Sequence, residues 1–281
     1  MLSDFEVIQQ RMSCRTFTNQ MVEIEKKSKL IQFFASNTEG PFGNRVQFLL
    51  ADFSELDPER IKKLGTYGVV RGASLFLVGR VINAPTAFID YGYCMEKNIL
   101  YATQLGLGTC WLGASFKRKE FKKLIPGNED DILPAISPIG YAAYKQSLLE
   151  SVMKNIARSK SRKPWNQLFF QDDFKTSLTE DEKNPFYKPF QAVRLAPSAY
   201  NMQPWRILFD SKKITFHFFM RRVGFRESFQ RAIPFQDLDM GIAMYHFDAV
   251  TKEMGLAGQW KNKKTKTDQK NFQYIVSWIA R

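Results

Sequence analysis

Residues 90–111 read DYGYCMEKNILYATQLGLGTCW, and residues 239–260 read DMGIAMYHFDAVTKEMGLAGQW. The two stretches align without a gap at a constant offset of 149 (239 minus 90), and an Asp, a Gly, a Met, a Gly-Leu pair and a Trp coincide. Apolar residues recur at helical spacing in the first stretch, which predicts helices over 88–106 and 238–255. Each helix should end at a Gly, where a left-handed turn is needed.

An internal repeat explains this coincidence better than chance similarity between two amphipathic helices. A weaker second match pairs residues 45–48 (RVQF) with residues 206–209 (RILF), each after a loop containing Gly or Pro. Two copies are too few for a solenoid. We interpret them as a pseudo-dimer in one chain, with halves at 1–164 and 165–281 joined by the basic stretch 159–164.

The rest of the sequence alternates helices with strands. Helices are expected at 5–11, 22–37, 116–124 and 187–195, and strands at 45–50, 73–81, 205–209, 214–219 and 272–280, with an extended segment at 134–144. The segments 39–44 and 197–204 carry Gly, Pro, Asn or Ser and are predicted to be loops.

Composition is that of an ordinary globular protein: 281 residues, 44% hydrophobic, 14% aromatic. The longest apolar runs, such as residues 73–78, are too short to span a bilayer. The N-terminus lacks the basic and apolar regions of a signal peptide, so we expect a cytoplasmic protein.

The formal net charge of +13 has three interpretations. Exposed lysines that keep the protein soluble are the simplest, an anionic cofactor is the second, and nucleic acid is the third. The basic clusters at 26–29, 117–123 and 261–266 are not interleaved with aromatics, which places nucleic acid last.

Cysteine and histidine are scarce. Cys14, Cys94 and Cys110 form no CxxC pair and are expected to be reduced thiols. The two histidines, His217 and His246, supply too few groups for a histidine-rich metal site or a Ser-His-Asp triad, and we expect both to be structural or on the surface.

Three short segments carry candidate chemistry, and each also has a structural interpretation. Residues 11–15 (RMSCR) offer two guanidiniums and a hydroxyl, which suit a phosphate, although for five residues alone a polar turn is the better interpretation. Residues 196–205 (APSAYNMQPW) combine a stiff backbone with amide side chains, which suits a planar heterocycle or a rigid connector. Residues 160–164 (KSRKP) are a solvated linker unless a phosphate lies beside them.

Together these segments resemble the nitroreductase superfamily of FMN-dependent NAD(P)H oxidoreductases. The family pattern Arg-x-Ser-x-Arg is matched at 11–15, Ala-Pro-Ser-x-x-Asn-x-Gln-Pro-Trp at 196–205, the helix end Gly-Leu-Gly and its following turn at 106–113, and Lys-Ser-Arg-x-Pro at 160–164. Residues 138–141 (PIGY) resemble the strand that follows. The resemblance spans nearly the whole chain and implies an α+β fold with mostly antiparallel sheets surrounded by helices.

The order of the motifs departs from the family. Ordinary members place the Pro-Ser…Gln-Pro-Trp loop soon after the Arg-x-Ser-x-Arg, but residues 35–45 here (ASNTEGPFGNR) lack it. In the family FMN lies at a homodimer interface, so the division of motifs implies one composite site between the two halves and a degenerate second site. A chain of this kind would act as a monomer.

The resemblance also implies roles for individual residues. The FMN phosphate would be bound by Arg11, Arg15, Lys160 and Arg162, with Ser13 on phosphate or ribityl oxygens. The second half would approach the ring or ribityl chain through Pro197, Ser198 and Asn201, and Gln203 would do the same or hold the loop. The backbone at Leu112 and Gly113 would face the ring edge. Cys14, flanked by Arg11 and Arg15, is either a thiol of lowered pKa or a packed small residue.

No general acid or base is identified, in keeping with flavin chemistry, in which the cofactor carries the hydride. The leading hypothesis is an oxidoreductase in which NAD(P)H reduces FMN, and FMN then reduces a nitro compound, quinone or similar small acceptor by a ping-pong scheme. The alternative is a flavin-binding or flavin-sequestering protein with little turnover. No metal, nucleic acid or membrane partner is expected.

Overall fold

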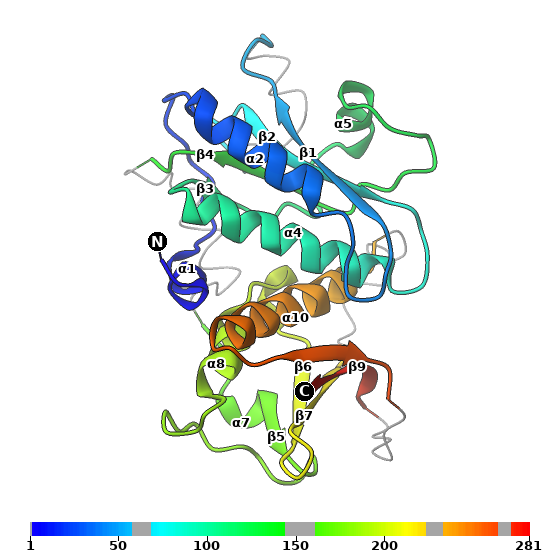
Figure 1. Cartoon of the computed structure of the whole chain (residues 1–281). Helices are drawn as coiled ribbons and strands as arrows, with labels where there is room; N and C mark the ends of the chain where they lie inside the picture. Colours follow the sequence, from blue (N-terminus) through cyan, green and yellow to red (C-terminus); the bar gives the residue numbers. More distant parts are fainter. Residues whose placement is uncertain (1, 58–68, 144–160, 223–232, 264–270) are drawn as a thin grey trace. The chain divides into compact units, whose positions relative to one another are not determined.

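A computed structural model describes residues 2–57, 69–143, 161–222, 233–263 and 271–281 (Figure 1). The chain divides into two compact units, Met1–Leu2 with Gln10–Ala157 and Ser3–Gln9 with Arg158–Arg281. The second unit therefore takes in the N-terminal helix and residues 158–164, which the sequence-based division at 164 places in the first half.

The first unit is a four-stranded sheet with helices. Its elements are α2 (Ile24–Ser36), β1 (Val46–Asp52), β2 (Leu75–Val81), α4 (Ala87–Gln104), β3 (Gly108–Thr109), α5 (Arg118–Leu124) and β4 (Ile136–Gly140). The strand order is β1-β2-β4-β3, and every pair is antiparallel.

The second unit is a five-stranded sheet with helices. Its elements are α1 (Asp4–Gln10), α7 (Trp165–Leu168), β5 (Phe169–Gln171), α8 (Tyr187–Leu195), the 3-10 turn η1 (Ala199–Asn201), β6 (Trp205–Asp210), β7 (Thr215–Met220), α10 (Phe235–Glu253), β8 (Gly258–Lys261) and β9 (Gln273–Ala280). The order is β5-β6-β7-β9-β8, and only the β5–β6 pair is parallel.

The two units share an order of elements over six helices and strands each, although β5 and α5 have no described counterpart. A helix, two antiparallel strands, a long helix and two further strands follow in the same order, and the sheets run β1-β2-β4-β3 and β6-β7-β9-β8. The α+β class with mostly antiparallel sheets is thereby confirmed.

The long helices α4 and α10 end in the same way. Beyond α4, Gly106 has φ +79°, its N–H donates to the carbonyl of Thr103, and Leu107 N–H donates to that of Ala102. Beyond α10, Gly255 has φ +73°, with matching bonds to Lys252 and from Leu256 to Thr251. This is the Schellman arrangement, which needs a left-handed residue and so explains the glycine in both copies.

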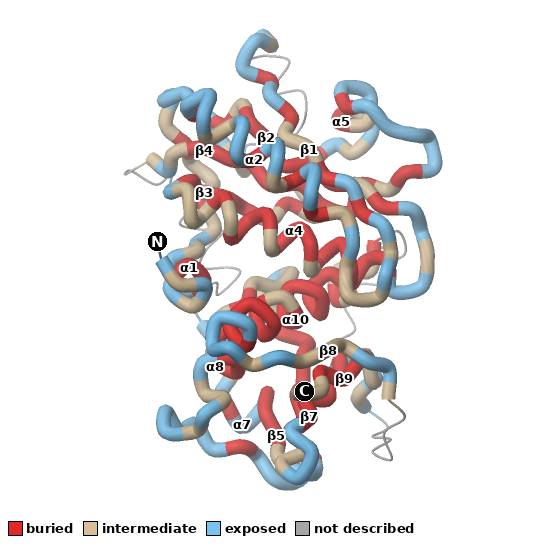
Figure 2. The backbone as a smooth tube through the Cα atoms, in the orientation of Figure 1, coloured by how far each residue is buried: buried red, intermediate tan, exposed pale blue. Residues whose placement is uncertain are grey.

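Burial explains why both long helices are apolar over most of their surface. Most of α4 and α10 is buried (Figure 2). In the first unit α4 packs on β1, β2 and β3. Phe121 of α5 makes ring contacts with Phe53, Phe76 and Phe116 and so joins α5 to the core. In the second unit Phe216 and Phe247 contact Trp278.

Sequence reasoning missed four short elements. It gave no strand at β3, β5 or β8 and no helix at α7, because segments of two to four residues carry no readable period. The remaining predicted elements are present, with ends shifted by up to four residues.

No helix in the described ranges is both long enough and apolar enough to cross a membrane. No group of three or more His, Cys, Asp or Glu side chains in the same ranges could hold a metal ion. The three cysteines are buried free thiols.

Candidate functional site

The Arg-x-Ser-x-Arg segment runs beside β3 in the first unit. Ser13 forms a parallel bridge with Thr109, and the Cys14 N–H donates to the Thr109 carbonyl at 2.8 Å. The segment therefore lies at the same sheet edge that leads, three residues later, to Leu112. Cys14 is buried, its Sγ donates to the Thr16 carbonyl, and it packs against Gly108, which favours the packed-residue interpretation.

Arg11 has an internal partner. Its side chain is 7% exposed, and its Nε lies 3.8 Å from Oε1 of Glu96, a carboxylate on α4 that is fully buried. The other oxygen of Glu96 accepts a 2.6 Å hydrogen bond from Nε1 of Trp111. Part of the Arg11 charge is thus neutralised within the unit.

Arg15 differs from Arg11 in this respect. Its Nε and Nη1 are buried, and neither has a hydrogen-bond partner among the residues that the structure describes. Its backbone carbonyl accepts from Arg71 N–H, which fixes the main chain at this point. Buried guanidinium nitrogens are costly to leave unpaired, so this group fits an anionic ligand.

The turn at Leu112 and Gly113 is held from two sides. Leu112 exchanges both backbone hydrogen bonds with Ile136, so its N–H is already used. The Gly113 carbonyl accepts from Nη2 of Arg118, a residue that also donates to the carbonyls of Leu133 and Pro134 at 3.0 Å. Of the two N–H groups expected at a ring edge, only that of Gly113 makes no hydrogen bond to a described residue.

The loop at 196–205 in the second unit has an unusual backbone. Tyr200, Asn201 and Gln203 all have positive φ, at +50°, +54° and +47°. Non-glycine residues rarely adopt this region, and such strain clusters at functional sites.

Side chains of the loop's own motif hold this conformation. The Gln203 N–H donates to Ser198 Oγ at 2.9 Å, and the Gln203 Nε2 donates to Asn201 Oδ1 at 3.1 Å. Gln203 is buried and Pro197 is partly exposed at the start of the loop. Of the two roles expected for Gln203, the observed bonds are those of a residue that holds the loop.

The structure brings the basic segment 161–163 onto this loop. Asn201 Nδ2 donates to the Ser161 carbonyl at 2.9 Å, and the Lys163 N–H donates to Gln203 Oε1 at 2.8 Å. Arg162 donates through Nη2 to the carbonyl of Leu195, which ends α8. Two motifs about 40 residues apart in sequence therefore form one surface of the second unit. Lys160 lies outside the described residues.

Two cationic side chains, Lys163 and Arg206, donate hydrogen bonds to backbone carbonyls of the strained loop. Lys163 Nζ donates to the carbonyl of Met202 at 2.7 Å, and Arg206 Nη1 donates to those of Gln203 and Trp205. Burial, and then repulsion from Arg206 and Arg221, lowers the pKa of Lys163 to about 8. Burial, followed by Arg221, lowers the pKa of Arg206 to about 10.

An aspartate on each long helix anchors a loop that leads into a strand, β1 in the first unit and β6 in the second. Asp90 accepts from the N–H groups of Phe42 and Asn44 and from Asn44 Nδ2. Asp239 accepts only one described hydrogen bond, from Ala199 N–H at 2.8 Å, and its Oδ2 is buried without a partner in the described ranges. Burial accordingly raises the pKa of Asp239 to about 8.

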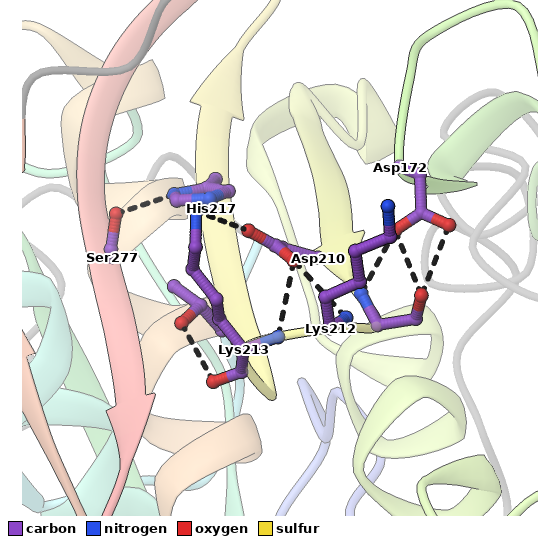
Figure 3. A network of polar contacts seen from close by, with 8 residues as sticks. Asp172, Asp210, Lys212, Lys213, His217 and Ser277 are labelled. Atoms are coloured by element: carbon purple, nitrogen blue, oxygen red, sulfur yellow. Dashed lines mark hydrogen bonds and ion pairs between the residues drawn. The ribbon is translucent and has the colours of Figure 1, made fainter.

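A serine, a histidine and an aspartate also meet in the second unit. His217 lies between Ser277 and Asp210, and its Nδ1 is 2.7 Å from Ser277 Oγ (Figure 3). Ser277 is fully buried and also bonds the hydroxyl of Tyr274 at 2.8 Å, so no substrate can reach it. Burial lowers the pKa of His217, the nearby Asp210 opposes this, and a structural role for this histidine follows.

Several of these residues were missed by sequence reasoning. Glu96 could have been found, because a carboxylate on the apolar arc of a helix, beside Met95 and Ile99, must have a buried partner. Arg118 and Lys163 gave no such signal, since their partners are backbone carbonyls of distant segments.

Comparisons with known proteins agree with the observed fold. The family model described as "Putative TM nitroreductase" matches residues 4–251. A "putative nitroreductase" structure from Thermotoga maritima MSB8 is 17% identical, with a TM-score of 0.61 over 99% of this chain and 94% of that one. No curated protein matches the chain.

Smaller nitroreductase structures match part of the chain. A nitroreductase family protein from Clostridium difficile 630 is 20% identical with a TM-score of 0.43, covering 58% of this chain and 94% of its own. A nitroreductase with bound FMN from Desulfitobacterium hafniense DCB-2 is 20% identical with a TM-score of 0.39, covering 52% of this chain and 93% of its own.

Proposed function

Because the chain belongs to the "Putative TM nitroreductase" family, whose model covers residues 4–251, we propose that it is an FMN-dependent NAD(P)H oxidoreductase. The acceptor would be a nitro compound, a quinone or a similar small molecule. The chain is proposed to work as a monomeric pseudo-dimer in the cytoplasm, with one composite site formed by motifs of both units.

The observation that carries the proposal is the pair of buried guanidinium nitrogens, Nε and Nη1, of Arg15. Two of its nitrogens lack a hydrogen-bond partner in the described part of the chain, and a phosphate could accept from both. Arg15 belongs to the 11–15 segment, which is fixed to β3 through Ser13 and Cys14. The backbone that carries the guanidinium is therefore held at a sheet edge. The donor set fits the phosphate of FMN.

The other residues would divide the remaining contacts. Arg11, Lys160 and Arg162 would add charge at the phosphate, and Ser13 a hydroxyl. The Gly113 N–H would donate at the ring edge, held there by Arg118 through the Gly113 carbonyl. Pro197, Ser198 and Asn201 would line the ring or ribityl chain.

FMN, when bound, supplies the hydride chemistry, and the chain's residues bind and orient it. The strained loop at 200–203 is pre-formed by Gln203, Lys163 and Arg206, so little ordering cost remains to be met on binding. Ser277 and His217 take no part, since they are buried within the sheet.

Visible absorption of the purified protein, before and after loading with FMN and desalting, tests the proposal. A retained flavin spectrum that NADH or NADPH bleaches, and that a nitro compound or quinone restores, is expected. Retained flavin that neither nucleotide bleaches would favour the flavin-sequestering alternative, and a protein that cannot be loaded would refute both.

Substitution of Arg15 tests the phosphate contact directly. Arg15→Ala is expected to weaken FMN binding by about 1–3 kcal/mol, the scale of a charged hydrogen bond. The exposed Arg45, which directly precedes β1, provides the matched control, because Arg45→Ala removes the same charge. Equal FMN dissociation constants in the two variants would contradict the assignment.

A further inference from the structure

The buried carboxylate of Glu96 connects two parts of the proposed flavin site. Glu96 is fully buried on α4, between Arg11, whose Nε is 3.8 Å away, and Trp111, whose indole N–H donates at 2.6 Å. Arg11 belongs to the segment proposed to bind phosphate. Trp111 directly precedes the Leu112–Gly113 turn proposed to face the ring.

Burying a carboxylate is costly, so Glu96 should have a reason to be there. An ionised carboxylate in an apolar helix face needs both a counter-charge and hydrogen bonds. Arg11 supplies the first and Trp111 the second. With its Nε side facing Glu96, the guanidinium keeps its remaining N–H donors for another acceptor.

The second unit shows that the fold itself does not require this arrangement. At the constant offset of the repeat, Trp260 corresponds to Trp111, and Tyr245 stands where Glu96 does. The Nε1 of Trp260 is buried and has no hydrogen-bond partner among the described residues. Both copies nevertheless keep the same helix ending and the same strand order.

A tryptophan at this place therefore packs without a carboxylate. What the first unit has in addition is the Arg-x-Ser-x-Arg segment and the turn at Gly113. The carboxylate is present in the unit that carries these groups.

We infer that Glu96 is a positioning residue for flavin binding, a role that rests on the proposed function. It orients Arg11 toward the phosphate and, through Trp111, fixes the turn that presents Gly113 N–H at the ring edge. One buried side chain would thereby position the groups that bind the phosphate and the ring of the flavin.

Comparing FMN with riboflavin separates the effect of Glu96 on Arg11 from its effect on Trp111. Riboflavin lacks the phosphate, so a variant that disturbs only Arg11 should weaken FMN and leave riboflavin binding unchanged. Glu96→Gln is such a variant, because glutamine keeps an oxygen for Trp111 but removes the charge that faces Arg11. We expect an FMN dissociation constant raised about tenfold, the scale of one charge-assisted hydrogen bond, with riboflavin within about twofold.

Trp111→Phe disturbs the contact between Glu96 and the turn at Leu112 and Gly113. It removes the indole donor and is expected to weaken FMN and riboflavin alike by about fivefold, as expected for one hydrogen bond. Trp260→Phe is the matched control, because its indole N–H has no described acceptor, and both flavins should bind it as they bind the wild type.

Flavin fluorescence quenching measures all eight dissociation constants, and thermal unfolding confirms that each variant is folded. If Glu96→Gln weakens riboflavin as much as FMN, or if Trp111→Phe and Trp260→Phe bind equally, the inference is overturned while the proposed function stands. A wild-type protein that binds neither flavin would overturn the proposed function and this inference together.

Discussion

The paired aspartates of the two long helices should respond in opposite ways to replacement by asparagine. Asp239 has a raised pKa of about 8, caused first by burial and opposed by one hydrogen bond from Ala199. In the unfolded chain the pKa returns to the ordinary aspartate value of 3.8. The folded state therefore binds more protons than the unfolded state between these values, and stability is lost as pH rises through this window.

The magnitude follows from the width of that window. Each pH unit between the two pKa values costs about 1.4 kcal/mol, so Asp239 should lower the free energy of unfolding by about 3 kcal/mol between pH 5 and pH 7. Asp239→Asn keeps an oxygen for the Ala199 N–H and has no charge to bury. It should abolish this part of the pH dependence and be at least as stable as the wild type at pH 7.

Asp90→Asn should do the reverse. Oδ1 of Asp90 accepts from Phe42, and Oδ2 accepts twice from Asn44. In asparagine one of these oxygens becomes an NH2 group, which is itself a donor and leaves at least one of the three N–H groups without an acceptor. A loss of about 1–3 kcal/mol is expected, the usual cost of an unsatisfied buried group.

Urea unfolding at pH 5, 6 and 7 measures both effects. Of the five tryptophans only Trp111 lies in the first unit, so tryptophan fluorescence mainly follows the second unit and Asp239, while circular dichroism follows both. An Asp239→Asn variant that keeps the wild-type dependence on pH would refute the reasoning, as would equal destabilisation by the two substitutions.

Two further outcomes follow from the same contacts. Gly40→Ala should destabilise the first unit by about 1–3 kcal/mol in urea unfolding, because a Cβ there would lie 2.3 Å from Oδ1 of Asp90, and an unchanged midpoint would contradict this loop packing. Lys163 has a folded pKa of about 8, below the ordinary lysine value of 10.5, so stability should rise between these values as the half-buried ammonium loses its proton. Lys163→Arg stays charged and should flatten that rise in denaturation at pH 8 to 10, whereas an identical rise would exclude Lys163 as its source.

Much of the fold was predictable because its signals are local. The period of residues 90–111 gave α4, and Gly106 and Gly255 marked both helix ends, since a left-handed residue after a helix is a requirement of the chain's own geometry. The likeness of residues 90–111 and 239–260 was visible because coincident residues at a constant offset need no structure to be compared. The family resemblance was visible for the same reason, and the family model that matches residues 4–251 confirms it.

The sequence predicted which motifs belong to the candidate site but only in part which contacts their residues make. The sequence indicated that residues 11–15, 112–113 and 196–205 matter, and it left the roles of Gln203 and Cys14 open. The structure adds that Gln203 holds the strained loop and that Cys14 is packed against Gly108.

Tertiary structure alone decided the contacts between distant segments. The docking of Lys163 on the 201–203 loop, the bracing of Gly113 by Arg118 and the burial of Glu96 between Arg11 and Trp111 join residues that no periodicity relates. Backbone carbonyls are the acceptors in several of these contacts, and every residue has one, so the sequence carries no mark of which will be used. The sequence by itself therefore determined the helices, their ends and the family motifs, while the positions of the charged side chains were decided only by the packing that excludes water from them.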